Sequence, residues 1–125
     1  MATLINSDIF VDALRGSEHA KDVLKNLSGQ EHVFYSLVSV AEILSHKSCD
    51  NPQTREATMK IFSVFEPVAL DDVLVQKAAY FRRRYSLLLP DAIIAATASQ
   101  LKAELITGST KDFSAVKEIK VKNPY

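Results

Sequence analysis

The sequence has no tryptophan, one cysteine, three glycines and four prolines, and its charges balance. The single cysteine, Cys49, excludes an internal disulfide and agrees with a reducing cytoplasm, which is the location we expect. So few glycines and prolines exclude collagen-like and low-complexity chains. Because fifteen basic residues match fifteen acidic ones, the overall charge gives no sign of a nucleic-acid-binding protein.

Long hydrophobic runs are also missing. No stretch of about 18 apolar residues occurs, which excludes a transmembrane helix, and we expect no association with a membrane. The first residues lack the basic segment of a secretory signal and meet a charge at Asp8, so we expect no signal peptide. The chain has 125 residues, 47% of them hydrophobic, which is enough for a core of its own. We predict a single domain over residues 1–125.

Short apolar segments alternate with segments of helical periodicity along the chain. Strands are predicted at residues 3–6, 32–35, 68–70, 104–107 and 119–121, and helices at 8–15, 18–27, 37–46, 54–65, 71–85 and 91–102. This alternation predicts an α/β fold, a three-layer α/β/α sandwich with a mainly parallel central sheet. In such sheets, functional sites form beyond the carboxyl ends of the strands.

Four acids and one amide occupy positions from which they could reach that edge of the sheet. They follow predicted strands or interrupt otherwise apolar helices: Asn6, Asp8, Glu42, Asp91 and Asp112. If the first strand extends to residue 8, the side chains at positions 6 and 8 point to the same side. Converging carboxylates repel one another unless a hard cation joins them, and such ligands select Mg²⁺ or Mn²⁺. Hydrolysis of a phosphodiester is the chemistry that such a centre supports.

Each of these acids also has an ordinary structural explanation. Asp8 can cap a helix, and Asp91 can interact favourably with a helix dipole. Glu42 can be a paired carboxylate, and Asp112 can belong to a turn. On the residues alone, these explanations are the stronger ones.

Four ordered motifs resemble those of the PIN-domain nucleases, in particular the VapC-like toxins of toxin–antitoxin pairs. They are LINSDIFVD at residues 4–12 with LRG at 14–16, SVAEIL at 39–44, LPDAIIAATA at 89–98, and LITGSTKDF at 105–113. The motif at 89–98 is the most specific of them. Together they cover nearly the whole chain in the family's order and spacing.

The resemblance implies a PIN-like fold and an endoribonuclease that depends on Mg²⁺ or Mn²⁺. By position, Glu42, Asp91 and Asp112 match three of the family's four metal-binding acids, and Asn6 stands where the fourth is normally an aspartate. The resemblance also implies an RNA substrate, a homodimer, and a VapB-like antitoxin that inserts a segment near the acids.

Asn6 departs from the family pattern, because an amide oxygen is a weak metal ligand and the amide NH₂ is a donor. Three explanations remain open. The chain uses Asp8 in a relaxed metal site, it is a naturally weakened nuclease, or Asn6 replaces an aspartate of the natural chain and inactivates it. We favour the third, because the other acids are retained. Gly108 and Ser109 also differ from the commoner Arg-Asn pair, although Ser109 could still orient water or Asp112.

Other charged residues are weaker candidates for contacts in the site. Arg82, Arg83 and Arg84, with Lys77 nearby on the same predicted helix, could contact RNA phosphates, but a solvated helix face explains them equally well. Asp12, one turn after Asp8, could lie next to the metal ligands without binding the metal, or it could be a solvent-exposed residue with a local hydrogen bond.

Two other functions stay open. A catalytically silent PIN domain could bind RNA or a partner protein. A receiver-like phospho-acceptor domain also gathers acids at the end of a sheet, but no acceptor aspartate follows a third strand and Lys111 lacks the right setting.

Overall fold

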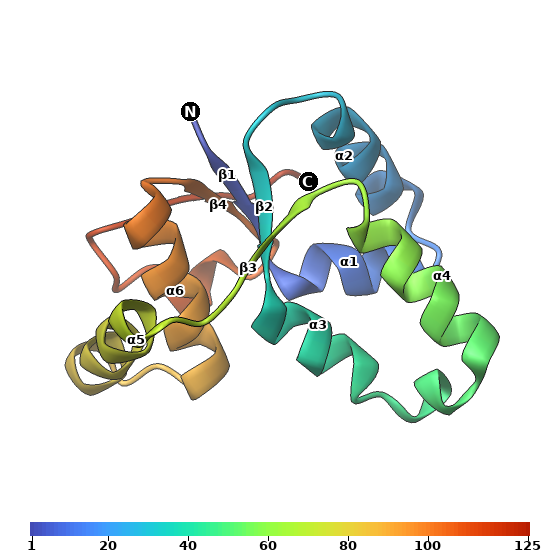
Figure 1. Ribbon diagram of the computed structural model, residues 1–125. Coiled ribbons are helices and arrows are strands. Elements are labelled where there is room, and N and C mark those ends of the chain that lie inside the picture. The colour runs from blue at the N-terminus through green and yellow to red at the C-terminus, as the bar shows by residue number, and fades with distance from the viewer.

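A parallel sheet of five strands runs through the middle of the structure, a computed structural model that describes residues 1–125 (Figure 1). The strands lie in the order β3-β2-β1-β4-β5, and every neighbouring pair is parallel. Their bounds are Thr3–Ile5 (β1), Val33–Ser36 (β2), Glu66–Val68 (β3), Glu104–Ile106 (β4) and Lys120–Lys122 (β5). The predicted α/β fold with a mainly parallel sheet is confirmed.

Helices connect the strands and cover both faces of the sheet. The α-helices are Ser7–Leu14 (α1), Glu18–Ser28 (α2), Leu37–Leu44 (α3), Pro52–Phe62 (α4), Asp72–Tyr85 (α5) and Leu89–Leu101 (α6), and the 3₁₀ turns are Lys47–Asp50 (η1) and Thr110–Phe113 (η2). In Figure 1, α5 and α6 lie on one side of the sheet and α1, α2 and α4 on the other, while α3 continues from the end of β2. None of the helices combines the length and the apolar character needed to cross a bilayer.

The sheet separates two hydrophobic cores. Leu4 and Leu105 pack with α5 and α6 on one face, whereas Ile5 and Ile106 pack with α1 and α2 on the other. Alternation along the two central strands explains this division. Residues 92–98 of α6 are all buried, and their small side chains let the helix approach the sheet closely. The lack of charge in this helix after Asp91 is thus a consequence of its burial.

The first strand is shorter than predicted. It ends at Ile5, and Asn6 is the N-cap residue of α1, so that Asp8 lies inside the first turn of the helix and does not cap it. Asn6 and Asp8 therefore do not share one face of a strand. The other elements agree with the prediction apart from shifts of one to three residues at their ends.

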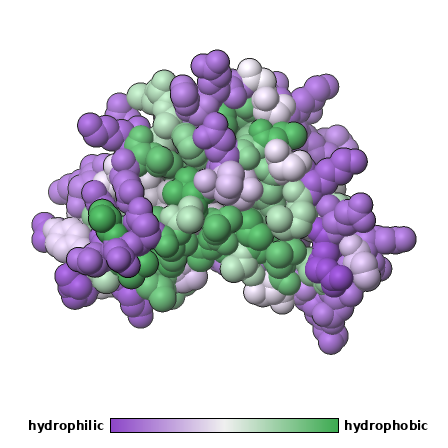
Figure 2. All heavy atoms as spheres, in the orientation of Figure 1, coloured by the Kyte–Doolittle hydropathy of each residue, from purple (hydrophilic) through white to green (hydrophobic).

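Apolar side chains reach the surface on one side of the molecule. Figure 2 shows a band of them across the lower middle of the view, between the lobe of α5 and α6 and the lobe of α3 and α4. The exposed large hydrophobic residues near the starts of α3, α5 and α6 include Leu37, Val73, Leu88 and Leu89. Exposed apolar groups on this scale commonly mark a protein interface.

Candidate active site

The segments that follow β1 and β4, the end of α3 and the start of α6 surround an open pocket of about 360 Å³. All five site residues predicted from the sequence line it: Asn6, Asp8, Glu42, Asp91 and Asp112. Asn6 and Asp8 come from the β1–α1 junction, Asp91 from the first turn of α6, and Asp112 from η2. The parallel sheet thus brings four distant segments to one edge, as such sheets do. The catalytic role of these residues stays a prediction.

The loop after β4 holds the carboxylate of Asp8. The Thr107 hydroxyl lies 3.1 Å from both carboxylate oxygens, and the Gly108 N–H donates to Oδ2 at 2.8 Å. The amide Nδ2 of Asn6 in turn donates to Thr107 Oγ1 at 3.1 Å. Asn6 and Asp8 therefore meet through a buried threonine, not through the alternation of a strand.

A second set of hydroxyl groups holds Glu42. The Ser7 hydroxyl lies 2.8 Å from Glu42 Oε1 and 2.8 Å from Ser39 Oγ. Because a carboxylate only accepts, Ser7 donates to Glu42 and accepts from the buried Ser39. This pair of bonds ties the start of α1 to α3.

Sequence reasoning missed the three hydroxyl residues that orient these acids, namely Ser7, Ser39 and Thr107. Thr107 lies in the motif at 105–113 and Ser39 begins the motif at 39–44, so small polar residues within the acidic motifs were the available signal. It also missed Tyr125, whose phenol donates to Asp12 Oδ2 at 2.7 Å. Nothing in the sequence around Tyr125 indicates this contact.

The pocket carries negative charge that no basic side chain neutralises. Burial, followed by repulsion from Asp112, Glu42 and Asp8, raises the pKa of Asp91 to about 6. The ion pairs of the structure all lie elsewhere, and Arg15 and His46 line the pocket without pairing with an acid. The acids are therefore crowded and uncompensated.

The donor set matches a hard divalent cation in its chemistry. Carboxylate oxygens and an amide oxygen are the ligands that Mg²⁺ and Mn²⁺ prefer. No three acidic, histidine or cysteine side chains lie close enough together to hold one ion directly. Mg²⁺ usually keeps several of its waters, so a few carboxylates spaced around a pocket suit it better than a closed cage.

The basic cluster at the end of α5 does not line the acidic pocket. Arg82 Nη1 donates to the carbonyl oxygen of Leu87 at 2.7 Å, and the Arg84 guanidinium lies 5.8 Å from the centre of the Tyr85 ring. The structure thus gives two of the arginines local partners. Contact with RNA phosphates stays a prediction for Arg82, Arg83, Arg84 and Lys77.

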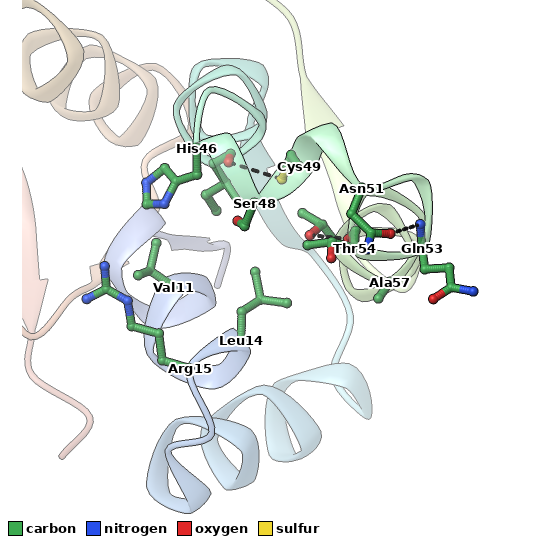
Figure 3. Close-up of a pocket in the computed structure, with 12 residues that line it drawn as sticks. Val11, Leu14, Arg15, His46, Ser48, Cys49, Asn51, Gln53, Thr54 and Ala57 are labelled. Carbon is green, nitrogen blue, oxygen red and sulfur yellow. Dashed lines mark hydrogen bonds between the residues drawn. The ribbon is translucent and has the colours of Figure 1, made fainter.

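A second cavity, of about 480 Å³, adjoins the acidic pocket between α1, α3, η1 and α4 (Figure 3). The side chains of Arg15 and His46 stand on one side of it, and those of Asn51 and Gln53 on the opposite side. The two cavities share four lining residues, Val11, Arg15, Ile43 and His46. The two cavities are therefore adjacent on the surface.

An α/β protein with an acidic pocket at the carboxyl edge of its sheet matches the class of fold that the sequence motifs resemble. The sequence model of the PIN domain matches residues 4–119, and the chain belongs to the PIN-domain family. No curated protein matches the sequence significantly.

Solved structures give the same result. A chain of a toxin–antitoxin complex from Klebsiella pneumoniae is 29% identical, with a TM-score of 0.83 over 99% of this chain and 98% of that one. VapBC2 from Rickettsia felis, bound to a promoter DNA fragment, is 19% identical, with a TM-score of 0.82 over 98% of both chains. DNA-bound VapBC from Salmonella typhimurium is 12% identical, with a TM-score of 0.83 over 100% of both. The last two show the shared fold. The resemblance to VapC-like PIN domains is confirmed, and such domains are generally nucleases that use divalent metals.

The raised pKa of Asp91 makes stability depend on pH. An unfolded aspartate has a pKa near 3.9, so the folded protein holds this proton more tightly, and the resulting stabilisation is lost as the pH rises through about 6. Asp91→Asn removes this titration. The substitution should therefore raise the free energy of unfolding by about 1 kcal/mol more at pH 7.5 than it does at pH 4.5, a figure reduced to allow for the partial exposure of Asp91. Urea unfolding in EDTA at the two pH values measures this.

The matched control is Asp22→Asn, on the exposed side of α2. It should leave the difference between the two pH values as it is in the unsubstituted protein. An Asp91→Asn variant with the same pH dependence as this control would contradict the crowding of acids in the pocket.

Proposed function

We propose that the chain is the metal-dependent endoribonuclease toxin of a toxin–antitoxin pair. The observation that carries the proposal is the convergence of Asp8, Glu42, Asp91 and Asp112 on one pocket without a basic partner. Asp8 and Asp91 are partly buried, and Glu42 and Asp112 are exposed. Carboxylates that crowd together without a cationic partner repel one another, so their collection in one place calls for a ligand. A divalent cation and a phosphodiester together supply the charges that such a pocket lacks.

In this proposal, the four acids hold one or two Mg²⁺ or Mn²⁺ ions. A bound cation of this kind lowers the pKa of water and stabilises negative charge on phosphate oxygens. The protein contributes orientation: Thr107 and Gly108 fix Asp8, and Ser7 fixes Glu42. Ligands that are oriented beforehand lose less freedom when they bind.

Asn6 fits its surroundings as an asparagine. Its Nδ2 donates to Thr107, whose single hydroxyl proton is directed to Asp8. An aspartate at position 6 would compete with Asp8 for that one proton. These bonds support the first of the three explanations, a relaxed site in which Asp8 supplies the charge, over the replacement of a natural aspartate favoured from the sequence.

Two partners complete the proposal. The neighbouring structures are complexes that contain an antitoxin. The cavity of Figure 3 shares lining residues with the acidic pocket, where a basic side chain of a VapB-like antitoxin could pair with the carboxylates. A second copy of the chain could cover the exposed apolar residues Leu37, Val73, Leu88 and Leu89.

Cleavage of RNA tests the activity. Total RNA should be cut in Mg²⁺ or Mn²⁺ and left intact in EDTA. Asp91→Ala should slow cleavage by about 100-fold or more, because loss of even a supporting residue of a metal site costs 10–100-fold. Asp22→Asn should cut at the unsubstituted rate.

The catalytically silent alternative makes a different prediction. The chain would then bind a divalent cation in calorimetry and never cut RNA. If it neither cuts RNA nor loses cation affinity in Asp91→Ala, the acidic pocket is not a metal site and the nuclease proposal fails.

Asn6→Asp separates the explanations of residue 6. If Asp8 supplies the fourth charge, this variant should be less stable without metal by about 1 kcal/mol, the typical worth of a hydrogen bond, and should cut RNA within a few-fold of the unsubstituted rate. Asn26→Asp, which adds the same charge on the exposed side of α2, is the control. A rise in cleavage of a hundredfold or more would instead show that Asn6 weakens the site, as the second and third explanations both require.

Light scattering tests the partners. The chain alone should have twice its 13.9 kDa mass, and the double variant Leu88→Glu/Leu89→Glu should have the single mass, because a buried charge opposes an apolar interface. Addition of a VapB-like antitoxin should give a heavier complex that no longer cuts RNA. A monomeric chain at all concentrations would contradict the dimer and leave the nuclease proposal untouched.

A further inference from the structure

The side chain of Tyr125 lies at the rim of the acidic pocket, far from the pocket residues in sequence. A Cβ atom placed on Gly108 would be 3.1 Å from Cε2 of the Tyr125 ring and 3.3 Å from Oδ2 of Asp8. The ring and the carboxylate thus flank the same glycine. Any side chain at position 108 would displace one or the other, which gives a physical reason for glycine there.

Three contacts hold the Tyr125 ring in one orientation. One is the packing against Gly108. The phenol also donates to Asp12 Oδ2 at 2.7 Å, and the ring of His19 lies 5.0 Å away between centres at an angle of 55°. Burial and the charges of Asp12 and Asp8 raise the pKa of the Tyr125 phenol well above its ordinary value, so the donor persists at any physiological pH.

The same residue remains 43% exposed. A surface tyrosine ordinarily samples several rotamers. When a ligand fixes one of them, the side chain loses conformational entropy, and this loss lowers the affinity. Here the contacts of the ring exist before any ligand arrives, and the residue still remains partly exposed beside the pocket. An aromatic ring held in this way is what an unpaired nucleobase stacks on.

The charge of the molecule adds a second reason. The chain has no net charge and the pocket is negative, so long-range attraction does not draw a polyanion to this place. Stacking needs no opposite charge and contributes about 1–3 kcal/mol for each base. Stacking on Tyr125 would therefore contribute affinity for RNA beside a pocket whose own charge does not attract it.

We propose that Tyr125 is the stacking platform for an unpaired RNA base next to the acidic pocket, and thereby a residue that binds and selects the substrate. The inference rests on the proposed function for the identity of the ligand as RNA. The competing role for Tyr125 is structural: it would only brace Gly108 and the loop that orients Asp8.

Binding of a single-stranded RNA that contains 2-aminopurine tests the proposal without turnover, in Ca²⁺ and in EDTA. Stacking on Tyr125 should quench the probe, and Tyr125→Leu should abolish the quenching and weaken binding by about tenfold, within the range for one stacked base. Tyr125→Phe retains the ring and should bind within about threefold of the unsubstituted chain. Tyr80→Leu is the matched control, because Tyr80 is also 43% exposed but lies on α5.

Cleavage kinetics give the second readout. Stacking predicts that Tyr125→Leu raises KM with little change in kcat, whereas a brace for Asp8 predicts a lower kcat in both Tyr125→Leu and Tyr125→Phe with KM unchanged. Thermal melting checks that each variant is folded. If Tyr125→Leu does not fold, Tyr125→Phe replaces it as the test, because the stacking role requires the Phe variant to bind RNA and quench the probe as the unsubstituted chain does.

The outcomes separate this inference from the proposed function. RNA binding that falls with Tyr125→Leu but not with Tyr80→Leu supports the platform even if no variant cuts RNA. Cleavage that proceeds normally while Tyr125→Leu binds and quenches as the unsubstituted chain does overturns the platform and leaves the nuclease intact. RNA that does not bind to the unsubstituted chain overturns the platform as well.

Discussion

Repulsion among carboxylates at one edge of the sheet is the constraint on which the rest of the structure depends. The four acids come from separate segments of the chain, namely Asp8, Glu42, Asp91 and Asp112. Because β2, β1 and β4 are parallel neighbours, these segments meet at one edge of the sheet. Their mutual repulsion and the burial of Asp91 oppose folding. Two cores, one on each face of the sheet, offset that penalty through apolar burial. The stability of the cores therefore permits a pocket that is unfavourable without its ligand.

Within the protein, the crowded carboxylates accept hydrogen bonds from neutral groups and form no ion pairs with basic side chains. Thr107 and the backbone N–H of Gly108 direct hydrogen bonds at Asp8, and Ser7 directs one at Glu42. Neutral donors orient a carboxylate and leave its charge in place. An arginine or lysine in the same positions would cancel the charge and occupy the oxygens that a metal needs. The network is thus compatible with ligand binding in a way that ion pairs would not be.

The sequence was sufficient to predict the alternating elements and the set of acids, because both depend on local patterns and ordered motifs. The apolar β1 and β4 and the uncharged stretch after Asp91 are visible without a structure. The orienting contacts were not predictable, since Thr107 meets Asp8 across 99 residues and Tyr125 meets Asp12 across 113. Such pairs follow from how the sheet brings the segments together. The predicted end of β1 was also wrong by one residue, and Asn6 and Asp8 lie at the start of α1 instead of on one face of a strand.

Asn6 is best understood through the number of charges that the pocket holds. With asparagine, Asp8 is the one carboxylate at the β1–α1 junction that Thr107 serves, and the amide provides a donor that completes the hydroxyl's bonds. With aspartate at position 6, a further carboxylate would enter a pocket in which burial and the repulsion of other acids already raise the pKa of Asp91 to about 6. The hydroxyl proton could then satisfy only one of two neighbouring acids. If Asp8 supplies the charge that the family normally carries at position 6, the number of carboxylates in the pocket does not rise, and every donor around Thr107 keeps an acceptor.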